Sequence, residues 1–231
     1  MTSQLFNFDA DFGARYDRFV RQAIFAYEPM FTMFLAMLRR SLGETANVLV
    51  VGSGTGMELA TFASRMPRWT FTGVDPSEQM IQLAQARLET EHLGERVHLH
   101  RGTVETLAAA EQFDAATLIL VLHFLPDDGP KRALQQNIAA RLKPGASLVL
   151  LDLGAEPQLE EDQSLLAGWK NYQILMGMDP VLVESVYKQA RETQHFIPEI
   201  RLRELLSEAG FVQVERFYQA FLHSGWTARR P

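Results

Sequence analysis

The chain has 231 residues, of which 47% are apolar and 22% are charged. These proportions are those of a globular domain that can bury a large core, and they exclude a disordered chain. The stretch without Asp, Glu, Lys or Arg around residues 118–122 runs only from Ala115 to Pro126, which is too short for a membrane-spanning helix of about 20 apolar residues. No basic side chain precedes Asp9, so we expect no secretory signal.

The charge balance and the lack of cysteine narrow the class of protein further. Lys and Arg total 22 against 28 Asp and Glu, a formal net charge of −6, and the basic residues are scattered. Proteins that grip a phosphate backbone usually show a basic stripe, so we expect no nucleic-acid surface. Without cysteine, disulfides, cysteine-based zinc sites and thiol catalysis are excluded. A cytoplasmic enzyme fits these observations.

The middle of the chain alternates between short apolar runs and segments with helical spacing. The expected strands are 47–51, 69–74, 97–100, 115–122 and 147–153. The expected helices between them are 57–66, a helix that opens at Ser77 and carries Met80, Ala84 and Leu88 on one face, and 131–142. Strand–helix repetition of this kind predicts an α/β fold with a parallel sheet and right-handed crossovers.

Two helical regions interrupt this alternation. Residues 8–42 contain a dense apolar stretch from Met30 to Leu38, which suits either the core or a subunit contact, and residues 158–196 are rich in aromatic side chains and methionine. A last helix (198–209), a strand (211–218) and a terminal run (219–228) that could pair with it complete the chain. We therefore expect a single domain over 1–231, with an N-terminal helical cap (1–42) and a helical insertion (156–197).

The most informative motif is Gly52-Ser53-Gly54-Thr55-Gly56, between the first strand and the following helix. Glycines let the chain turn tightly and let a ligand approach the backbone, and the helix start offers free N–H groups. The loop lies at the carboxyl end of a strand, where open α/β sheets bind ligands. A dinucleotide-binding fingerprint needs a third glycine where this chain has Met57, so a dehydrogenase is disfavoured.

Asp75 ends the second expected strand. A carboxylate in this place can accept two hydrogen bonds from the vicinal hydroxyls of a ribose. The alternative is structural: a glycine turn, with Asp75 as the N-cap of the next helix.

The glycine loop, the helix after it and Asp75 together resemble class I S-adenosylmethionine-dependent methyltransferases. The resemblance implies a Rossmann-like, doubly wound sheet of seven strands, mostly parallel with an antiparallel last strand. It also implies S-adenosylmethionine as the cofactor, with its methionine part at the glycine loop and its ribose at Asp75.

The segment from Phe8 to Tyr27, the run 121–125 and the C-terminal segments 208–211 and 217–221 resemble a particular branch, the carboxy-S-adenosylmethionine synthases of tRNA modification. Together the two resemblances imply that the cofactor is bound by Tyr27, Gly52, Ser53, Gly54, Gly56, Asp75, Pro76, Met80, Thr103, Val104 and Leu120.

The chain departs from this branch at two positions. An asparagine that contacts the ligand is replaced by Ile119, and an arginine that anchors the extra carboxylate is replaced by Tyr187, with Lys188 beside it. Loss of a charge-assisted hydrogen bond removes about 1.5–3 kcal/mol. We therefore expect the ordinary cofactor rather than the carboxylated one.

His123 follows the fourth expected strand, at the mouth of the expected site. It could act as the general base that removes a proton from an acceptor, although it could equally pack against Phe124, and direct attack on the methyl group often needs only alignment. His98 and His100 share a strand face but lack a third ligand at suitable spacing, so we expect no metal site.

The sequence thus predicts an S-adenosylmethionine-dependent methyltransferase with an unidentified acceptor, expected to be a small molecule. Two alternatives stay open: a carboxy-S-adenosylmethionine synthase-like enzyme and a non-catalytic protein that binds S-adenosylmethionine. The sequence also leaves a homodimer open.

Overall fold

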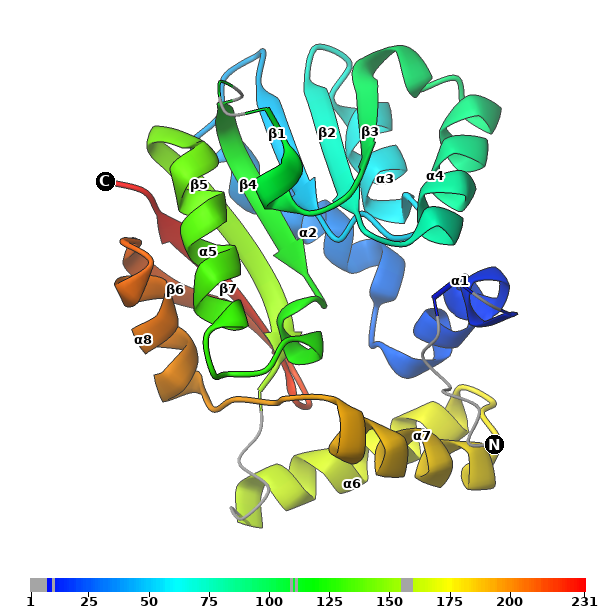
Figure 1. Cartoon of the computed structure of the whole chain (residues 1–231). Coiled ribbons are helices and arrows are strands. Elements are labelled where there is room, and N and C mark those ends of the chain that lie inside the picture. Colours follow the sequence, from blue (N-terminus) through cyan, green and yellow to red (C-terminus); the bar gives the residue numbers. More distant parts are fainter. Residues whose placement is uncertain (1–7, 10, 109, 111, 155–159) are drawn as a thin grey trace.

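A seven-stranded sheet forms the centre of the described structure. The computed structural model describes residues 8, 9, 11–108, 110, 112–154 and 160–231. The strands are β1 (Asn47–Val51), β2 (Thr70–Asp75), β3 (Val97–Arg101), β4 (Phe113–Ile119), β5 (Leu142–Leu153), β6 (Val212–Ala220) and β7 (His223–Arg229). Their order is β3-β2-β1-β4-β5-β7-β6, and β7 runs antiparallel to both its neighbours (Figure 1). The predicted Rossmann-like sheet with an antiparallel last strand is confirmed.

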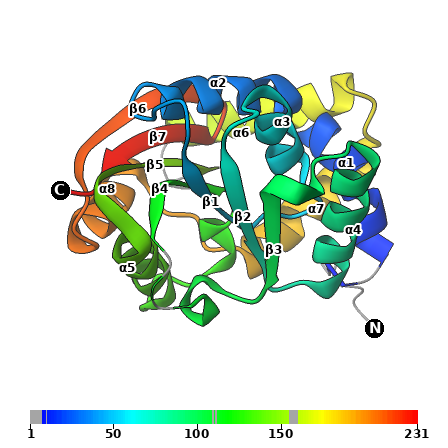
Figure 2. The same ribbon diagram turned by 90° about the horizontal axis from the view of Figure 1, so that it is seen from above.

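Helices cover both faces of this sheet, which explains why its central strands are apolar at nearly every position. The covering helices are α2 (Tyr27–Arg39), α3 (Met57–Arg65), α4 (Glu78–Thr90), α5 (Pro130–Arg141) and α8 (Glu199–Glu208). Helices α2 and α3 lie on one side of β1, and α5 and α8 lie on the other (Figure 2). Successive side chains of β1 point to opposite faces: Val48 and Val50 pack with α2 and α3, whereas Leu49 packs with α5 and α8.

The apolar stretch in the N-terminal region lies in the core. It forms α2, whose buried side chains are Tyr27, Met30, Phe31, Phe34, Leu35 and Leu38. These side chains pack against β1, β5 and α3. Of the two alternatives, the structure therefore favours core packing over a subunit contact for this face.

The remaining helices gather at the carboxyl ends of the parallel strands (Figure 1). They are α1 (Asp11–Ala23), α6 (Glu160–Leu175), α7 (Pro180–Thr193) and the 3-10 helices η2 (Val104–Thr106) and η3 (Leu122–Phe124), whereas the 3-10 helix η1 (Gly94–Arg96) directly precedes β3 at its amino end. The indole N–H of Trp169 donates to the carbonyl of Ala23 at 2.6 Å, so α6 is joined to α1. Residues 1–7 and 10 of the expected cap, and 156–159 of the expected insertion, lie outside the described residues.

Two element boundaries differ from the sequence prediction. β4 ends at Ile119 rather than at Leu122, because Leu120 adopts a left-handed φ of 58° and the chain turns into η3. β5 begins at Leu142, before Pro144 and Gly145, and a register shift in its pairing with β4 accommodates these residues. No helix among the described residues combines the length and the apolar character that crossing a membrane requires.

Candidate active site

The three glycines of the loop after β1 have different structural roles, although all have positive φ. A Cβ at Gly52 would lie 2.3 Å from the Cγ2 atom of Val121, and a Cβ at Gly56 would lie 3.0 Å from the backbone of Ala84. Both glycines therefore permit close packing. A Cβ at Gly54 would meet nothing within 4 Å, so the middle of the loop faces open space where a ligand can approach.

Asp75 joins β2 to this loop. Its Oδ2 atom accepts the N–H of Gly54 at 2.9 Å and its Oδ1 atom accepts the N–H of Ser77 at 2.9 Å. Burial raises the pKa of Asp75, and these two hydrogen bonds oppose the rise. Ser77, and not Asp75, is the N-cap of α4, because its hydroxyl accepts the N–H of Met80. The capping alternative for Asp75 is thus wrong, and the carboxylate keeps acceptor capacity for a ligand.

A small cavity, which we call the loop cavity, lies against the glycine loop. It is lined by Tyr16, Tyr27, Phe31, Gly52, Ser53, Gly54, Thr55, Met57, Glu58, Ile119 and Leu120. Five of the predicted cofactor residues therefore meet at one place. The volume is about 30 Å³, roughly that of one water molecule, so a nucleoside requires the aromatic side chains of α1 and α2 to move aside.

Two buried polar atoms of residues that line the loop cavity lack a hydrogen-bond partner among the described residues. They are Ser53 Oγ and Glu58 Oε1, and both side chains are 5% exposed. Buried polar groups are nearly always paired, so these atoms fit a polar ligand. Burial raises the pKa of Glu58 to about 7. The sequence prediction missed Glu58; its only signal was an acidic side chain within the apolar start of the helix.

The other predicted cofactor residues do not line the loop cavity. Gly56 packs against α4, Pro76 is exposed, and Met80 and Val104 are buried. The Thr103 hydroxyl donates to Glu105 Oε2 at 2.6 Å.

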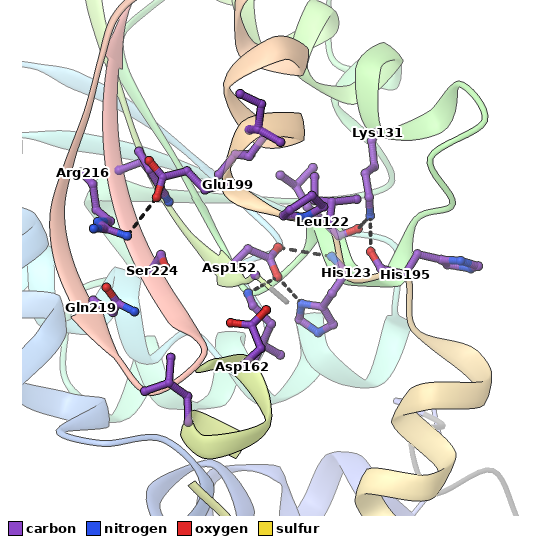
Figure 3. A pocket seen from close by; sticks show the side chains of 18 residues that line it. Leu122, His123, Lys131, Asp152, Asp162, His195, Glu199, Arg216, Gln219 and Ser224 are labelled. Atoms are coloured by element: carbon purple, nitrogen blue, oxygen red, sulfur yellow. Dashed lines mark hydrogen bonds and ion pairs between the residues drawn. The ribbon is translucent and has the colours of Figure 1, made fainter. Parts of the chain in front are cut away.

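His123, in η3, forms a buried pair with Asp152 at the end of β5 (Figure 3). His123 Nδ1 lies 2.5 Å from Asp152 Oδ1, and the His123 N–H donates to Asp152 Oδ2 at 3.2 Å. Burial alone would raise the pKa of Asp152, but the charge and hydrogen bond of His123, together with the N–H of Leu153, lower it overall. The sequence did not indicate Asp152, because 29 residues separate it from His123.

Lys131 holds the segment that carries His123. Its Nζ atom donates to the carbonyl oxygens of Leu122 at 2.6 Å and His195 at 2.8 Å (Figure 3). It also donates to the carbonyl oxygen of Leu125 at 2.6 Å. The side chain is fully buried, and burial lowers the pKa of Lys131. The ammonium group therefore ties η3 to the chain that follows α7.

His123 lies between two further cavities. One, of about 290 Å³, includes Asp152, Asp162 and His195 in its lining (Figure 3). The other, of about 80 Å³, is mainly apolar and is called the apolar chamber below. Its lining is Phe8, Tyr16, Phe19, Val20, Ala23, Ile24, Leu120, His123, Phe124, Leu153, Trp169, Gln173, Val186, Ala190, Gln194 and His223. The apolar chamber and the loop cavity share Tyr16 and Leu120.

The N-terminal segment is fastened to the glycine loop. Asp17 Oδ1 accepts the hydroxyl of Thr55 at 2.6 Å, and Asp17 Oδ2 forms an ion pair with Arg87. Arg87 Nε in turn donates to the Thr55 carbonyl at 2.8 Å. Farther along, the Ser77 hydroxyl donates to Asp9 at 2.6 Å.

Comparisons with known proteins agree with this fold. Residues 48–145 match the methyltransferase domain family. The chain is 30% identical over 193 residues to demethylmenaquinone methyltransferase of Lactiplantibacillus plantarum, covering 78% of this chain and 77% of the relative. It is 23% identical over 231 residues to carboxy-S-adenosyl-L-methionine synthase of Desulfotalea psychrophila, covering 96% and 93%. The chain belongs to the class I S-adenosylmethionine-dependent methyltransferases.

Solved structures share the fold. An O-methyltransferase family protein from Burkholderia thailandensis superposes with a TM-score of 0.70 at 18% identity, over 99% of this chain and 63% of that one. The chain thus spans less than two thirds of that protein. The 1,6-didemethyltoxoflavin-N1-methyltransferase of Burkholderia thailandensis, with its substrate and S-adenosylhomocysteine bound, gives a TM-score of 0.63 at 23% identity, over 95% and 85%.

Proposed function

We propose that the chain binds S-adenosylmethionine at the glycine loop and Asp75, and that it methylates a small molecule held in the apolar chamber. The observation that carries this proposal is the common wall of the two cavities, Tyr16 and Leu120. When bound, S-adenosylmethionine supplies a methyl group on a positively charged sulfur. The chain's own residues align the acceptor and exclude water.

The cofactor contacts of individual residues are part of the proposal. Tyr27, Gly52, Ser53, Gly54 and Leu120 line the loop cavity and would surround the methionine part. Asp75 would accept the ribose hydroxyls. Other predicted contacts follow β2 and β3 along the chain and would border the nucleoside: Pro76 after β2, Met80 in the first turn of α4, and Thr103 and Val104 after β3. Gly56 would act through packing.

His123 would act as a general base for a hydroxyl or amine acceptor. Asp152 lies at the Nδ1 atom of His123, which leaves Nε2 to accept a proton if Nδ1 carries the hydrogen. Such an aspartate orients the ring and stabilises its charged form. Because His123 also lines the apolar chamber, an acceptor held there is within its reach.

The carboxylated cofactor is the second candidate, because a carboxy-S-adenosylmethionine synthase matches nearly the whole chain. The charges near the site favour the ordinary cofactor. Neither the loop cavity nor the apolar chamber has a lysine or arginine in its described lining. The cavity of about 290 Å³ is lined by Lys131 and Arg216, but Lys131 donates to backbone carbonyls and Arg216 donates to Glu199, so both cations already have partners. Ile119 lines the loop cavity in place of the ligand-contacting asparagine of the synthases, and its apolar side chain cannot form a hydrogen bond to a ligand.

The ligand that copurifies with the protein tests the choice of cofactor. Mass spectrometry should detect S-adenosylmethionine or its demethylated product; a donor with an extra carboxyl group would overturn the proposal in favour of the synthase. A thermal-shift experiment with S-adenosylhomocysteine at 100 times its dissociation constant should show about 2.7 kcal/mol of stabilisation. Binding without turnover of any acceptor would favour the non-catalytic alternative.

Two further expectations stay predictions: a cytoplasmic location, and a single domain over 1–231 with the helical cap 1–42 and insertion 156–197. The contacts of α1 with α6 support the second. A homodimer stays open, and light scattering after size-exclusion chromatography tests it.

A further inference from the structure

Glu58 is a buried acidic side chain beside the glycine loop. It lies in the first turn of α3, directly after the glycine loop, and is 5% exposed. It lines the loop cavity together with Gly52, Ser53 and Leu120. Its Oε1 atom has no hydrogen-bond partner in the described part of the chain. A buried carboxyl group in such a place requires an explanation.

The described neighbours of Glu58 supply no positive charge. A hydrogen bond from the Thr117 side chain on β4 opposes the pKa rise of Glu58, but threonine is uncharged and Oε1 is still without a partner among the described residues. The charge of Glu58 contributes to the raised pKa of Tyr27 on α2. Tyr16 and Asp17 also raise that pKa, and Arg87 lowers it. Arg87 is paired with Asp17. Among the described residues, no lysine, arginine or histidine forms an ion pair with Glu58.

We propose that Glu58 is the counter-ion of the α-ammonium group of the cofactor's amino-acid tail. This inference rests on the proposed function. S-adenosylmethionine carries two positive charges, and only the ammonium has N–H donors, three in number. It could therefore satisfy Glu58 Oε1 and Ser53 Oγ together, both of which lack a partner. A sulfonium offers charge but no hydrogen bond, so it would leave these acceptors unsatisfied.

The titration of Glu58 makes the proposal measurable. Without a cation, burial raises its pKa to about 7, so the carboxyl group is about half protonated at neutral pH. A positive charge at hydrogen-bond distance favours the ionised form and lowers the pKa of a carboxyl group. Burial raises the pKa of Tyr16 and Tyr27 above 10, so neither tyrosine exchanges protons in this range. Binding of an ammonium group should release the proton of Glu58.

Isothermal titration calorimetry of the full chain tests this without an acceptor. The ligands are S-adenosylhomocysteine, which has the ammonium but no sulfonium, and 5′-methylthioadenosine, which lacks the amino-acid tail. Titrations at pH 7 in phosphate and in Tris, whose ionisation enthalpies differ, give the number of protons released. The variants are Glu58→Gln and the matched control Glu91→Gln, at an exposed position on the end of α4.

The wild type should release about half a proton with S-adenosylhomocysteine and none with 5′-methylthioadenosine. Glu58→Gln should release none and should bind S-adenosylhomocysteine about 10- to 100-fold more weakly, with unchanged affinity for 5′-methylthioadenosine. Glu91→Gln should behave as the wild type does. If Glu58→Gln does not fold, the comparison of the two ligands on the wild type decides.

The assignment of Glu58 and the proposed function can be refuted by different results. If the wild type binds S-adenosylhomocysteine but Glu58→Gln binds it equally well, the assignment of Glu58 is overturned and the proposed function stands. Equal proton release with both ligands also overturns it. If the wild type binds neither ligand, the proposed function fails and the assignment fails with it.

Discussion

Replacing Glu58 by glutamine should change how the stability of the ligand-free protein depends on pH. Burial raises the pKa of Glu58 from 4.5 to about 7 in the folded chain. The folded state therefore binds the proton more tightly than the unfolded state. The contribution of Glu58 to the free energy of unfolding falls as pH rises from 4.5 to 7. At about 1.4 kcal/mol per pKa unit the full loss is about 3 kcal/mol, of which about 2.5 kcal/mol falls between pH 5 and pH 8.

Other buried groups titrate in part of this range, so the difference between variants is the quantity to measure. Burial lowers the pKa of His223 from 6.5 to about 4. The contribution of His223 to the free energy of unfolding therefore increases as pH rises from 4 to 6.5. Urea unfolding of the wild type and Glu58→Gln across these pH values cancels this contribution. The stability of Glu58→Gln relative to the wild type should rise by about 2.5 kcal/mol from pH 5 to pH 8. Parallel curves would refute the reasoning, and Glu91→Gln should give them.

Three more changes test the site. Asp75→Asn should weaken S-adenosylhomocysteine binding in calorimetry by about 10- to 150-fold, because it removes hydrogen bonds to a charged group; an unchanged affinity would refute the ribose contact. Gly52→Ala should lower the unfolding free energy by about 2–4 kcal/mol, since the new Cβ meets Val121 at a φ of 73°. Adding Val121→Ala should recover the part of this loss that comes from the contact with Val121, but not the part that comes from the positive φ. Urea unfolding measures both. His123→Gln should lower kcat about 100-fold or more, leaving S-adenosylhomocysteine affinity unchanged; a kcat equal to that of the wild type would exclude His123 as the base.

The positions of the central strands and the glycine loop could be predicted because each depends on local sequence, whereas the seven-stranded sheet with its antiparallel last strand was expected from the family resemblance. The apolar run before Gly52 and the acidic residue at the end of β2 are both visible in a short window. The pair His123–Asp152 could not be found in this way, since it joins the ends of two strands that lie side by side only in the folded sheet.

Glu58 was missed for a related reason. A glutamate at the start of a helix is usually solvated and favoured by the helix dipole. Its burial depends on how α2 places Tyr27 over the loop cavity, and spacing within the sequence does not report that packing. The apolar chamber likewise requires Trp169 and Val186 from α6 and α7, whose return over the sheet periodicity alone does not specify.

The attachment of Asp17 to Thr55 has a mechanical consequence. Thr55 belongs to the loop that meets the donor, whereas the helix of Asp17 also carries Phe19 and Val20, which form part of the acceptor's wall. A ligand that displaces Thr55 should therefore also shift α1 and change the shape of the apolar chamber. We expect that binding of the cofactor and binding of the acceptor influence each other through this hydrogen bond.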